Sequence, residues 1–339
     1  MKAKGRFTRP LLSIIVPMYN EASNIEVFYS RAQSVLDQTG MDWEMICVND
    51  GSKDNTLEIL SRLHERDPQV KVIDLSRNFG KESALTAGLD YASGDAAIPM
   101  DADLQDPPEL IFDLIEKWLE GYEIVNAVRI AREGETWLKR CTAFAFYRLI
   151  NRMVRFNLPR DTGDFRLLSR PVLDALKGLN ERRRFMKGLF AWVGFHSTNV
   201  YYRRESRYSG TSKWGYWKLW NFALEGITSF TQAPLQFATY LGLLVATGSF
   251  LYGLFVVIRT LFMGSHVPGY PSLMTVILFL GGVQLMAMGI IGEYVGRIYE
   301  ESKERPVYLV REQLGVPAPE PTPRERREDQ SMLPVGRIS

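Results

Sequence analysis

Two long stretches with almost no charged residues lie toward the C-terminal end of this chain of 339 residues. Residues 235–263 contain one charged side chain, Arg259, and residues 273–292 contain none. A bilayer core about 30 Å thick is spanned by roughly 20 apolar residues of helix, so either stretch is long enough. The alternative is a helical hairpin buried in a soluble core. We expect a two-helix transmembrane hairpin over residues 233–297.

The charges that flank this hairpin predict its orientation. The loop between the two stretches, residues 264–271, has no Lys or Arg. Basic side chains lie on the other side of both stretches: Arg203, Arg204, Arg207, Lys213, Lys218, Arg297, Lys303, Arg305 and Arg311. The positive-inside rule therefore predicts a protein of the inner or plasma membrane with two spans and both termini in the cytoplasm. Residues 1–10 form a basic tail without the apolar core of a signal peptide.

The first hundred residues alternate between short apolar runs and stretches with a helical pattern. The expected strands are residues 11–16, 43–48, 70–75, 96–100 and, further along, 124–129; the expected helices are 21–37, 54–65 and 81–92. Such alternation predicts βαβ units and an α/β, Rossmann-like fold with a mostly parallel sheet. In sheets of this kind, ligands bind beyond the carboxyl ends of the strands.

Polar motifs follow four of the expected strands. They are Pro17-Met-Tyr-Asn-Glu21, Asn49-Asp-Gly-Ser52, Ser76-Arg-Asn-Phe-Gly-Lys81 and Asp101-Ala-Asp103. The spacing of Asp101 and Asp103 places both carboxylates on one side of an extended segment, where they can share a hard cation. Mg²⁺ or Mn²⁺ held by one or two carboxylates takes its other ligands from water and substrate phosphates. Taken alone, such a pair is more often a solvated turn at a strand end than a metal site, but four motifs at one sheet edge indicate a site.

Composition narrows the function classes. With 41 basic and 39 acidic side chains, the net charge of +2 gives no reason to expect nucleic-acid binding. The two cysteines and three histidines lack metal-ligand spacing. A metal site made of histidine or cysteine ligands is therefore not expected.

Several segments carry membrane or assembly signals. Residues 136–158 form a basic amphipathic stretch with aromatics, which lies on a membrane surface or packs on its own domain. The Trp-rich residues 214–232 are expected to form an interfacial juxtamembrane helix. Glycines 289, 292 and 296 allow close helix packing, against the first span or, in a homo-oligomer, against another subunit. Residues 298–315 are expected to be a cytoplasmic segment and residues 316–339 a disordered tail.

Taken together, the motifs resemble the inverting glycosyltransferases of family two, which have the GT-A fold. The closest resemblance is to the polyisoprenyl-phosphate sugar transferases, among them dolichyl-phosphate mannose synthases and bactoprenol glucosyltransferases. The matching segments are residues 16–21, 50–52, 77–81, 101–108, 161–166 and 207–213, so that the resemblance extends from residue 11 to about residue 315. It implies a cytoplasmic GT-A domain over residues 11–213, followed by two transmembrane helices.

The resemblance also implies roles for individual residues. The nucleotide sugar would be bound by Pro17, Tyr19, Glu21, Asp50, Lys81 and Asp101, a metal by Asp101, Asp103 and Gln105, and catalysis would rest on Asp101, Asp103 and Asp164. Three of these have plain structural alternatives: Glu21 as a helix cap, Asp50 as a turn residue, and Lys81 as an exposed charge. For Asp164 we expect orientation, or charge balance with Arg166. Proton abstraction is less needed, because a monophosphate acceptor with a second pKa near 6 is largely ionised.

The acceptor would be a polyisoprenyl phosphate. Its phosphate needs cationic partners, which we expect to be Arg129, Arg132, Arg204, Arg207 and Lys213. Attraction to anionic lipids is a compatible alternative. The Gly163-Asp-Phe-Arg166 motif favours the bactoprenol branch, with UDP-glucose as donor and undecaprenyl phosphate as acceptor. GDP-mannose and UDP-N-acetylhexosamine stay open as donors. A processive polysaccharide synthase and a non-catalytic membrane scaffold are the alternative functions.

Overall fold

The computed structural model describes residues 9–130, 162–179, 181–182, 184–203, 233–263 and 269–317. Two compact units are present. The sheet unit comprises the described residues up to 203 and, again, those from 306 onward; the hairpin unit comprises the described residues from 233 to 305. The sheet unit is therefore interrupted in sequence by the hairpin unit.

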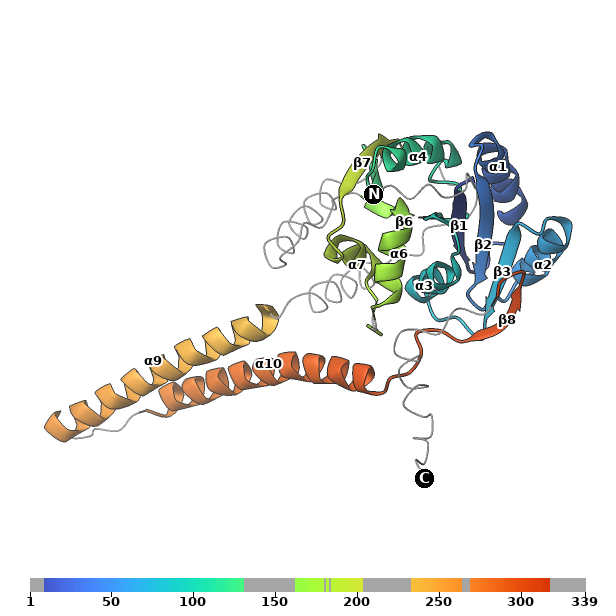
Figure 1. Cartoon of the computed structure of the whole chain (residues 1–339). Helices are drawn as coiled ribbons and strands as arrows, with labels where there is room; N and C mark the ends of the chain where they lie inside the picture. Colours follow the sequence, from blue (N-terminus) through green and yellow to red (C-terminus); the bar gives the residue numbers. More distant parts are fainter. Residues whose placement is uncertain are drawn as a thin grey trace, which may run out of the picture. The chain divides into compact units, whose positions relative to one another are not determined.

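The sheet unit contains one sheet of eight strands (Figure 1). The strands are β1 (Leu11–Met18), β2 (Asp42–Asn49), β3 (Val70–Leu75), β4 (Ala96–Pro99), β5 (Ile124–Arg129), β6 (Thr162–Ser169), β7 (Ser197–Tyr202) and β8 (Val310–Leu314). Their order is β7-β5-β6-β4-β1-β2-β3-β8. Strands β4, β1, β2 and β3 are parallel, as are β5 and β7, whereas β6 is antiparallel to both its neighbours and β8 is antiparallel to β3. The mostly parallel α/β fold is confirmed.

Helices cover both faces of this sheet. They are α1 (Ile25–Gln38), α2 (Thr56–Arg66), α3 (Lys81–Tyr91), the short 3-10 helix η1 (Pro108–Leu110), α4 (Ile111–Leu119), α6 (Arg170–Lys177) and α7 (Met186–Trp192). Helices α1, α2 and α4 share one core with the sheet, while α3, α6 and α7 pack on the other face. This is why β1 reads as a continuous apolar run: Ile14 joins the first core, and Ile15 faces α3.

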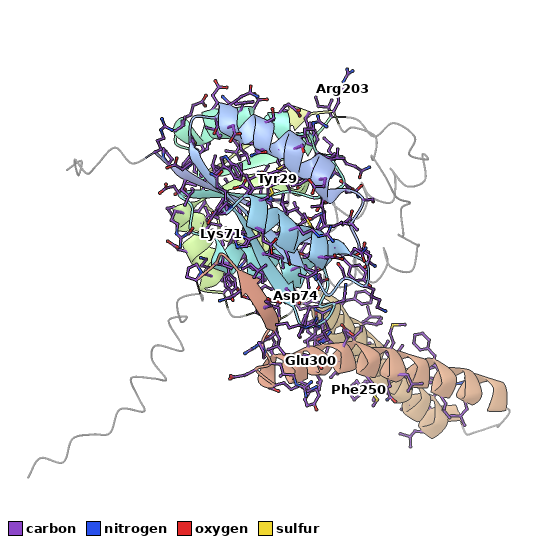
Figure 2. The ribbon with its side chains drawn as sticks, turned by 90° about the vertical axis from the view of Figure 1, so that its right-hand side faces the viewer. Tyr29, Lys71, Asp74, Arg203, Phe250 and Glu300 are labelled. Carbon is purple, nitrogen blue, oxygen red and sulfur yellow. The ribbon has the colours of Figure 1, made fainter. Side chains whose placement is uncertain are left out.

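The strands expected from the sequence are all present. The first helix starts later than expected, at Ile25 instead of residue 21, because residues 21–24 form a turn in which the Asn24 side-chain amide donates to the Glu21 carboxylate at 2.6 Å. Three further strands, β6, β7 and β8, were not predicted by the pattern. Strand β8 follows the hairpin in sequence and lies beside β3, where Asp74 is labelled in Figure 2.

The hairpin unit consists of α9 (Ala233–Met263) and α10 (Tyr270–Ser302), which pack against each other (Figure 1). Residues 235–252 and 279–302 are long and apolar enough to cross a membrane. Large apolar side chains on both helices are exposed, among them Leu244 at 72% and Leu285 at 71%. A Cβ added at Gly289, Gly292 or Gly296 would meet no described atom within 4 Å, so this glycine stripe is not packed against α9 in the described structure.

Several expectations concern residues that lie outside the described ranges. These are the amphipathic stretch 136–158, the juxtamembrane helix 214–232, most of the two tails, and four of the five cations expected to bind the acceptor phosphate, namely Arg132, Arg204, Arg207 and Lys213. They stay predictions.

Candidate functional site

The loops after β1 and β2 form one rim at the carboxyl edge of the sheet. The backbone N–H of Asn20 donates to Ser52 Oγ at 2.9 Å, and the Asn20 side chain accepts from the N–H of Lys53 at 2.8 Å. Asn20 has a φ of 56°, a left-handed conformation that asparagine tolerates better than most residues. The N–H of Glu21 donates to Thr56 Oγ1 at 3.0 Å. The first two polar motifs therefore lie side by side, as their positions after parallel strands predict.

The predicted nucleotide-sugar residues of the first motif lie on this rim. Pro17 is within β1, and Tyr19 follows the strand with 39% of its surface exposed. Glu21 lies in the turn before α1, where its carboxylate accepts from Asn24. Their contact with a nucleotide stays a prediction.

Asp50 connects the end of β2 to the loop before α3. Its buried carboxylate accepts the backbone N–H groups of Phe79 at 2.7 Å and Gly80 at 3.0 Å. Burial raises the pKa of Asp50, and these two amides partly offset the rise. The neighbouring Gly51 has a φ of +63°, and a Cβ there would lie 2.4 Å from the backbone carbon of Arg77. Asp50 thus positions the third motif, and its expected contact with the nucleoside stays a prediction.

Lys81 lies between two carboxylates from different strands. Its Nζ is 2.6 Å from Asp101 Oδ1, after β4, and 2.7 Å from Asp164 Oδ2, on β6. Burial opposes the charged form, but the attraction of Asp101 and Asp164 outweighs it and raises the pKa of Lys81 above its usual value. The ammonium group is therefore charged at neutral pH. Three residues predicted from separate motifs thus meet at one point.

Asp164 is ionised in this arrangement. Burial alone would raise its pKa, but neighbouring cations, Lys81 first, hold the pKa of Asp164 well below its usual range. The direct partner of its carboxylate is Lys81, and the expected charge balance with Arg166 is a weaker contribution to the same lowering of the Asp164 pKa. The buried Arg166 lies over the Phe190 ring at 4.3 Å, and burial lowers its pKa to about 10. A carboxylate with a depressed pKa is a weak base, which favours the orienting role over proton abstraction.

Two residues of the site were not found from the sequence. Glu82 accepts the backbone N–H of Met186 at 3.3 Å, and burial together with the charge of Asp164 raises the pKa of Glu82 to about 7. Lys187, on α7, lies in the same electrostatic cluster, and burial lowers its pKa. Glu82 adjoins Lys81 in its motif, which was an available signal. No such signal in the sequence marked Lys187, because its place in the site depends on how α7 packs against the sheet.

Asp101 and Asp103 belong to a tight turn after β4. The carboxylate of Asp103 accepts the backbone N–H of Gln105 at 3.1 Å, and the intervening Leu104 has a φ of 57°. Carboxylate and amide oxygens at one turn suit Mg²⁺ or Mn²⁺. The other oxygen of Asp164 is buried with no hydrogen-bond partner in the described structure. No group of three or more His, Cys, Asp or Glu that could hold a metal occurs among the described residues, so a cation here would also need phosphate and water ligands.

Arg129, at the end of β5, connects elements near one edge of the sheet. Its Nε donates to the Tyr202 hydroxyl at 3.1 Å, its Nη2 lies 3.5 Å from Asp106 Oδ1, and Tyr202 also donates to Asp106. A Cβ at Gly163 would lie 2.8 Å from Nη2, so glycine leaves room for the guanidinium group. These contacts join β5, β6 and β7 to the turn that carries Asp101. The expected role of Arg129 in binding acceptor phosphate stays a prediction.

Comparison with known proteins agrees with this architecture. The family model described as glycosyl transferase family 2 matches residues 13–177, and the model described as GtrB C-terminal hairpin matches residues 233–298. An uncharacterised glycosyltransferase from Synechocystis is 56% identical over 305 residues, which cover 90% of this chain and 96% of that protein.

Other relatives have more informative names. The bactoprenol glucosyl transferase of Shigella phage SfV is 51% identical over 300 residues, covering 88% of this chain and 98% of that protein. A prophage bactoprenol glucosyl transferase homolog from Escherichia coli is 47% identical over 300 residues, covering 88% and 98%. Among solved structures, a mannosyltransferase from Pyrobaculum calidifontis in complex with GDP-Man and Mn²⁺ is 18% identical with a TM-score of 0.44, over 86% of this chain and 76% of that one.

The sequence identity to these relatives extends across both the sheet unit and the hairpin. The mostly parallel sheet with the Asp101 turn at its carboxyl edge is the GT-A arrangement expected from the motifs. The chain therefore belongs to glycosyl transferase family 2, in the group that combines a GT-A domain with the GtrB C-terminal hairpin and includes the bactoprenol glucosyl transferases.

Proposed function

We propose that this protein transfers a hexose from a nucleotide sugar to a polyisoprenyl phosphate in the membrane, with inversion at the anomeric carbon. The preferred donor is UDP-glucose and the preferred acceptor is undecaprenyl phosphate. The products are then a polyprenyl-monophosphoryl sugar and a nucleoside diphosphate. The observation that carries the proposal is the cluster of Lys81 with Asp101 and Asp164 at the carboxyl edge of the sheet. The two named relatives that are 51% and 47% identical to this chain are bactoprenol glucosyl transferases or homologues of them by name, which supports the same reaction class.

The charges of the cluster suit a diphosphate leaving group. Lys81 is a fixed cation next to the Asp101 turn, and it would bind the donor diphosphate when a phosphate oxygen replaces one of its carboxylate partners. A divalent Mg²⁺ or Mn²⁺ held by Asp101, Asp103 and Gln105 would neutralise the negative charge that develops on the departing diphosphate. The ionised Asp164 holds Lys81 in place from the opposite side.

The reaction is a single displacement. An oxygen of the acceptor phosphate forms a bond to the anomeric carbon while the bond from that carbon to the donor diphosphate breaks, and the electron pair leaves with the nucleoside diphosphate. Direct attack inverts the configuration, so that an α-linked donor gives a β-linked product. With a second pKa near 6, the acceptor phosphate is already largely ionised at neutral pH. Asp164 is then needed for orientation more than for proton transfer.

The membrane would present the acceptor to this site. We place α9 and α10 across the inner or plasma membrane with both chain termini in the cytoplasm, in line with the apolar exposed helices and the basic flanking residues. Arg132, Arg204, Arg207 and Lys213, with Arg129, would then supply cations for the acceptor phosphate and for the headgroup region.

Donor screening of the full-length protein tests the proposal. The protein in lipid nanodiscs would be given a short polyprenyl phosphate with UDP-glucose, UDP-N-acetylglucosamine or GDP-mannose, in Mg²⁺ or in Mn²⁺, and the lipid product would be identified by mass spectrometry. We expect a single hexose on the lipid, formed fastest from UDP-glucose and lost on chelation of the metal. Long glycan products would instead indicate a processive synthase, and no transfer from any donor would indicate a non-catalytic scaffold.

Replacing both acids of the turn, Asp101 and Asp103, is the decisive test of the proposed site. Removing one group that stabilises transition-state charge typically costs about 10²–10³ in rate, so Asp101→Ala combined with Asp103→Ala should reduce transfer at least that far. Undiminished transfer by this double variant would exclude the proposed site.

A further inference from the structure

Residues 308–314, here called the return strap, follow α10 in sequence and add β8 to the edge of the sheet. The strap contacts both ends of residues 76–91, the loop and helix that carry Lys81. At the first end, the backbone N–H of Ser76 donates to the carbonyl of Leu309 at 2.8 Å. The carbonyl of Ser76 in turn accepts from the Arg311 guanidinium at 2.5 Å. Both backbone polar groups of Ser76 are thus bound by the strap.

The second end is the C-terminal turn of α3. There the Tyr308 hydroxyl donates to Asp90 Oδ2 at 2.9 Å. Burial, followed by the charge of Asp90, raises the pKa of Tyr308, and burial raises that of Asp90. Both residues are partly buried, where a hydrogen bond is more costly to lose than at the surface.

Arg311 has a second contact, with a buried acid on β3. Its Nη1 lies 3.5 Å from Asp74 Oδ2, an oxygen that has no hydrogen bond within the described residues, while Asp74 Oδ1 accepts from Asn49 at 2.7 Å. The guanidinium of the strap therefore balances a buried carboxylate next to the start of the loop. Figure 2 labels Asp74 at this edge.

Between the two ends, further contacts hold the segment against the sheet. Asp50 binds the N–H groups of Phe79 and Gly80, directly before Lys81. Gly88 allows α3 to approach β1, since a Cβ there would lie 2.2 Å from Ile15 Cγ2. Lys81 is thus placed by contacts on both sides of it, and the outermost of these come from chain that follows the hairpin.

We propose that the return strap is a positioning element of the active site, which sets the place of Lys81 and hence the affinity for the donor diphosphate. The inference rests on the proposed function in that it assigns Lys81 to the diphosphate. It assigns Tyr308 and Arg311 no contact with substrate. Their effect passes through residues 76–91.

The test uses full-length protein in nanodiscs with Tyr308→Phe and Arg311→Ala, singly and together. Glu312→Gln is the matched control, because Glu312 lies on the same strand with an exposed side chain. Hydrogen exchange of residues 76–91 and steady-state kinetics with the nucleotide sugar are measured on each. We expect the double variant to exchange its amides at residues 79–84 roughly tenfold faster and to raise the donor KM about five- to tenfold, with a smaller change in kcat. Arg311→Lys should recover part of both effects.

Two outcomes overturn the proposal. Unchanged exchange in a folded double variant means that the strap does not hold the segment. Faster exchange with an unchanged donor KM means that the strap has a structural role only. If the double variant does not fold, the Tyr308→Phe variant, which loses one hydroxyl, decides by the same two measurements. A wild-type protein that transfers no sugar would refute the proposed function, while hydrogen exchange would still test the strap.

Discussion

At the scale of single residues, Lys81 is the cation that faces Asp101 and Asp164 at once. Replacing it with Met leaves two facing carboxylates without their cation and removes a charge from the diphosphate site. We expect Lys81→Met to lower kcat/KM for transfer about 10²–10³-fold. Lys81→Arg, which keeps the charge, should lose less. Steady-state kinetics with the nucleotide sugar measure both, and equal activity of the Met variant and wild type would contradict the assignment.

Asp164 provides a test by pH. Its depressed pKa keeps it ionised across the neutral range, so an orienting role predicts that Asp164→Asn reduces the rate by a similar factor at every pH. A base that deprotonates the acceptor would instead matter most below the second phosphate pKa, near 6. The ratio of wild-type to variant rates, followed from pH 5 to pH 8 with the same acceptor, should therefore stay constant. A ratio that falls steeply as the pH rises past 6 would identify Asp164 as the base.

Glu82 predicts a pH-dependent change in stability. Its pKa is raised from 4.5 to about 7, so ionising it costs folding free energy, and that cost begins near pH 4.5 and is fully present above pH 7. Glu82→Gln removes the cost. Relative to wild type, the variant should unfold at a higher temperature at pH 8.5 and at nearly the same temperature at pH 4. Glu65→Gln, on the exposed side of α2, should show no such trend, and a Glu82→Gln difference that shrinks as pH rises would refute this account.

The residues of the site were predictable to the extent that they lay in local motifs. Lys81 and Asp101 follow predicted strands, so their sheet edge could be predicted from chain order. Asp164 lies on β6, which was not predicted as a strand, and it was found through the resemblance of its motif. Glu82 follows Lys81 at the start of α3, so its place in the site could have been predicted from the same motif. Lys187 enters through the packing of α7 on the sheet, which no local pattern specifies. For the same reason, the engagement of Arg129 with Asp106 and Tyr202 was not predictable.

At the scale of elements, the position of α3 depends on one small residue. A Cβ at Gly88 would lie 2.2 Å from a side-chain carbon of Ile15, in a core packed on both sides. Gly88→Ala should therefore push α3 away from β1 and reduce the unfolding free energy by about 1–3 kcal/mol, the usual range for overpacking. Gly178→Ala is the control, because its nearest contact would be an ordinary 3.4 Å. Thermal or denaturant unfolding of both variants measures the difference. A Gly88→Ala variant as stable as wild type would show that the core accommodates the methyl group.

Strands β1 to β5 were predicted because they are short, mostly apolar runs. Strand β8 was not, because its sequence, Val310-Arg-Glu-Gln-Leu314, is a short polar run of the kind found at sheet edges and in loops alike. Residues 310–314 form a strand because they pair with β3, and the local sequence does not predict that these two segments lie side by side. Its antiparallel pairing places Leu314 opposite Val72.

At the scale of the whole molecule, the apolar stretches of the sequence correspond to α9 and α10, and their orientation can be tested. In a chain with Cys47→Ala and Cys141→Ala, a cysteine at Ser265 should react with a membrane-impermeant maleimide in intact cells, whereas one at Ser331 should react only after permeabilisation. The reverse labelling pattern would overturn the proposed topology. Labelling of both positions in intact cells would place the two sites outside and exclude a hairpin.

The two edges of the sheet also constrain how the protein is made. Strands β7 and β8 lie at opposite edges, and the whole hairpin is translated between them. During synthesis, β3 must therefore present an open row of backbone groups until residues 310–314 emerge from the ribosome, after both membrane helices. With the proposed topology, both membrane helices are translated before the strand that closes the sheet, so this edge of the catalytic unit is completed only after the segments that anchor it to the membrane have been made.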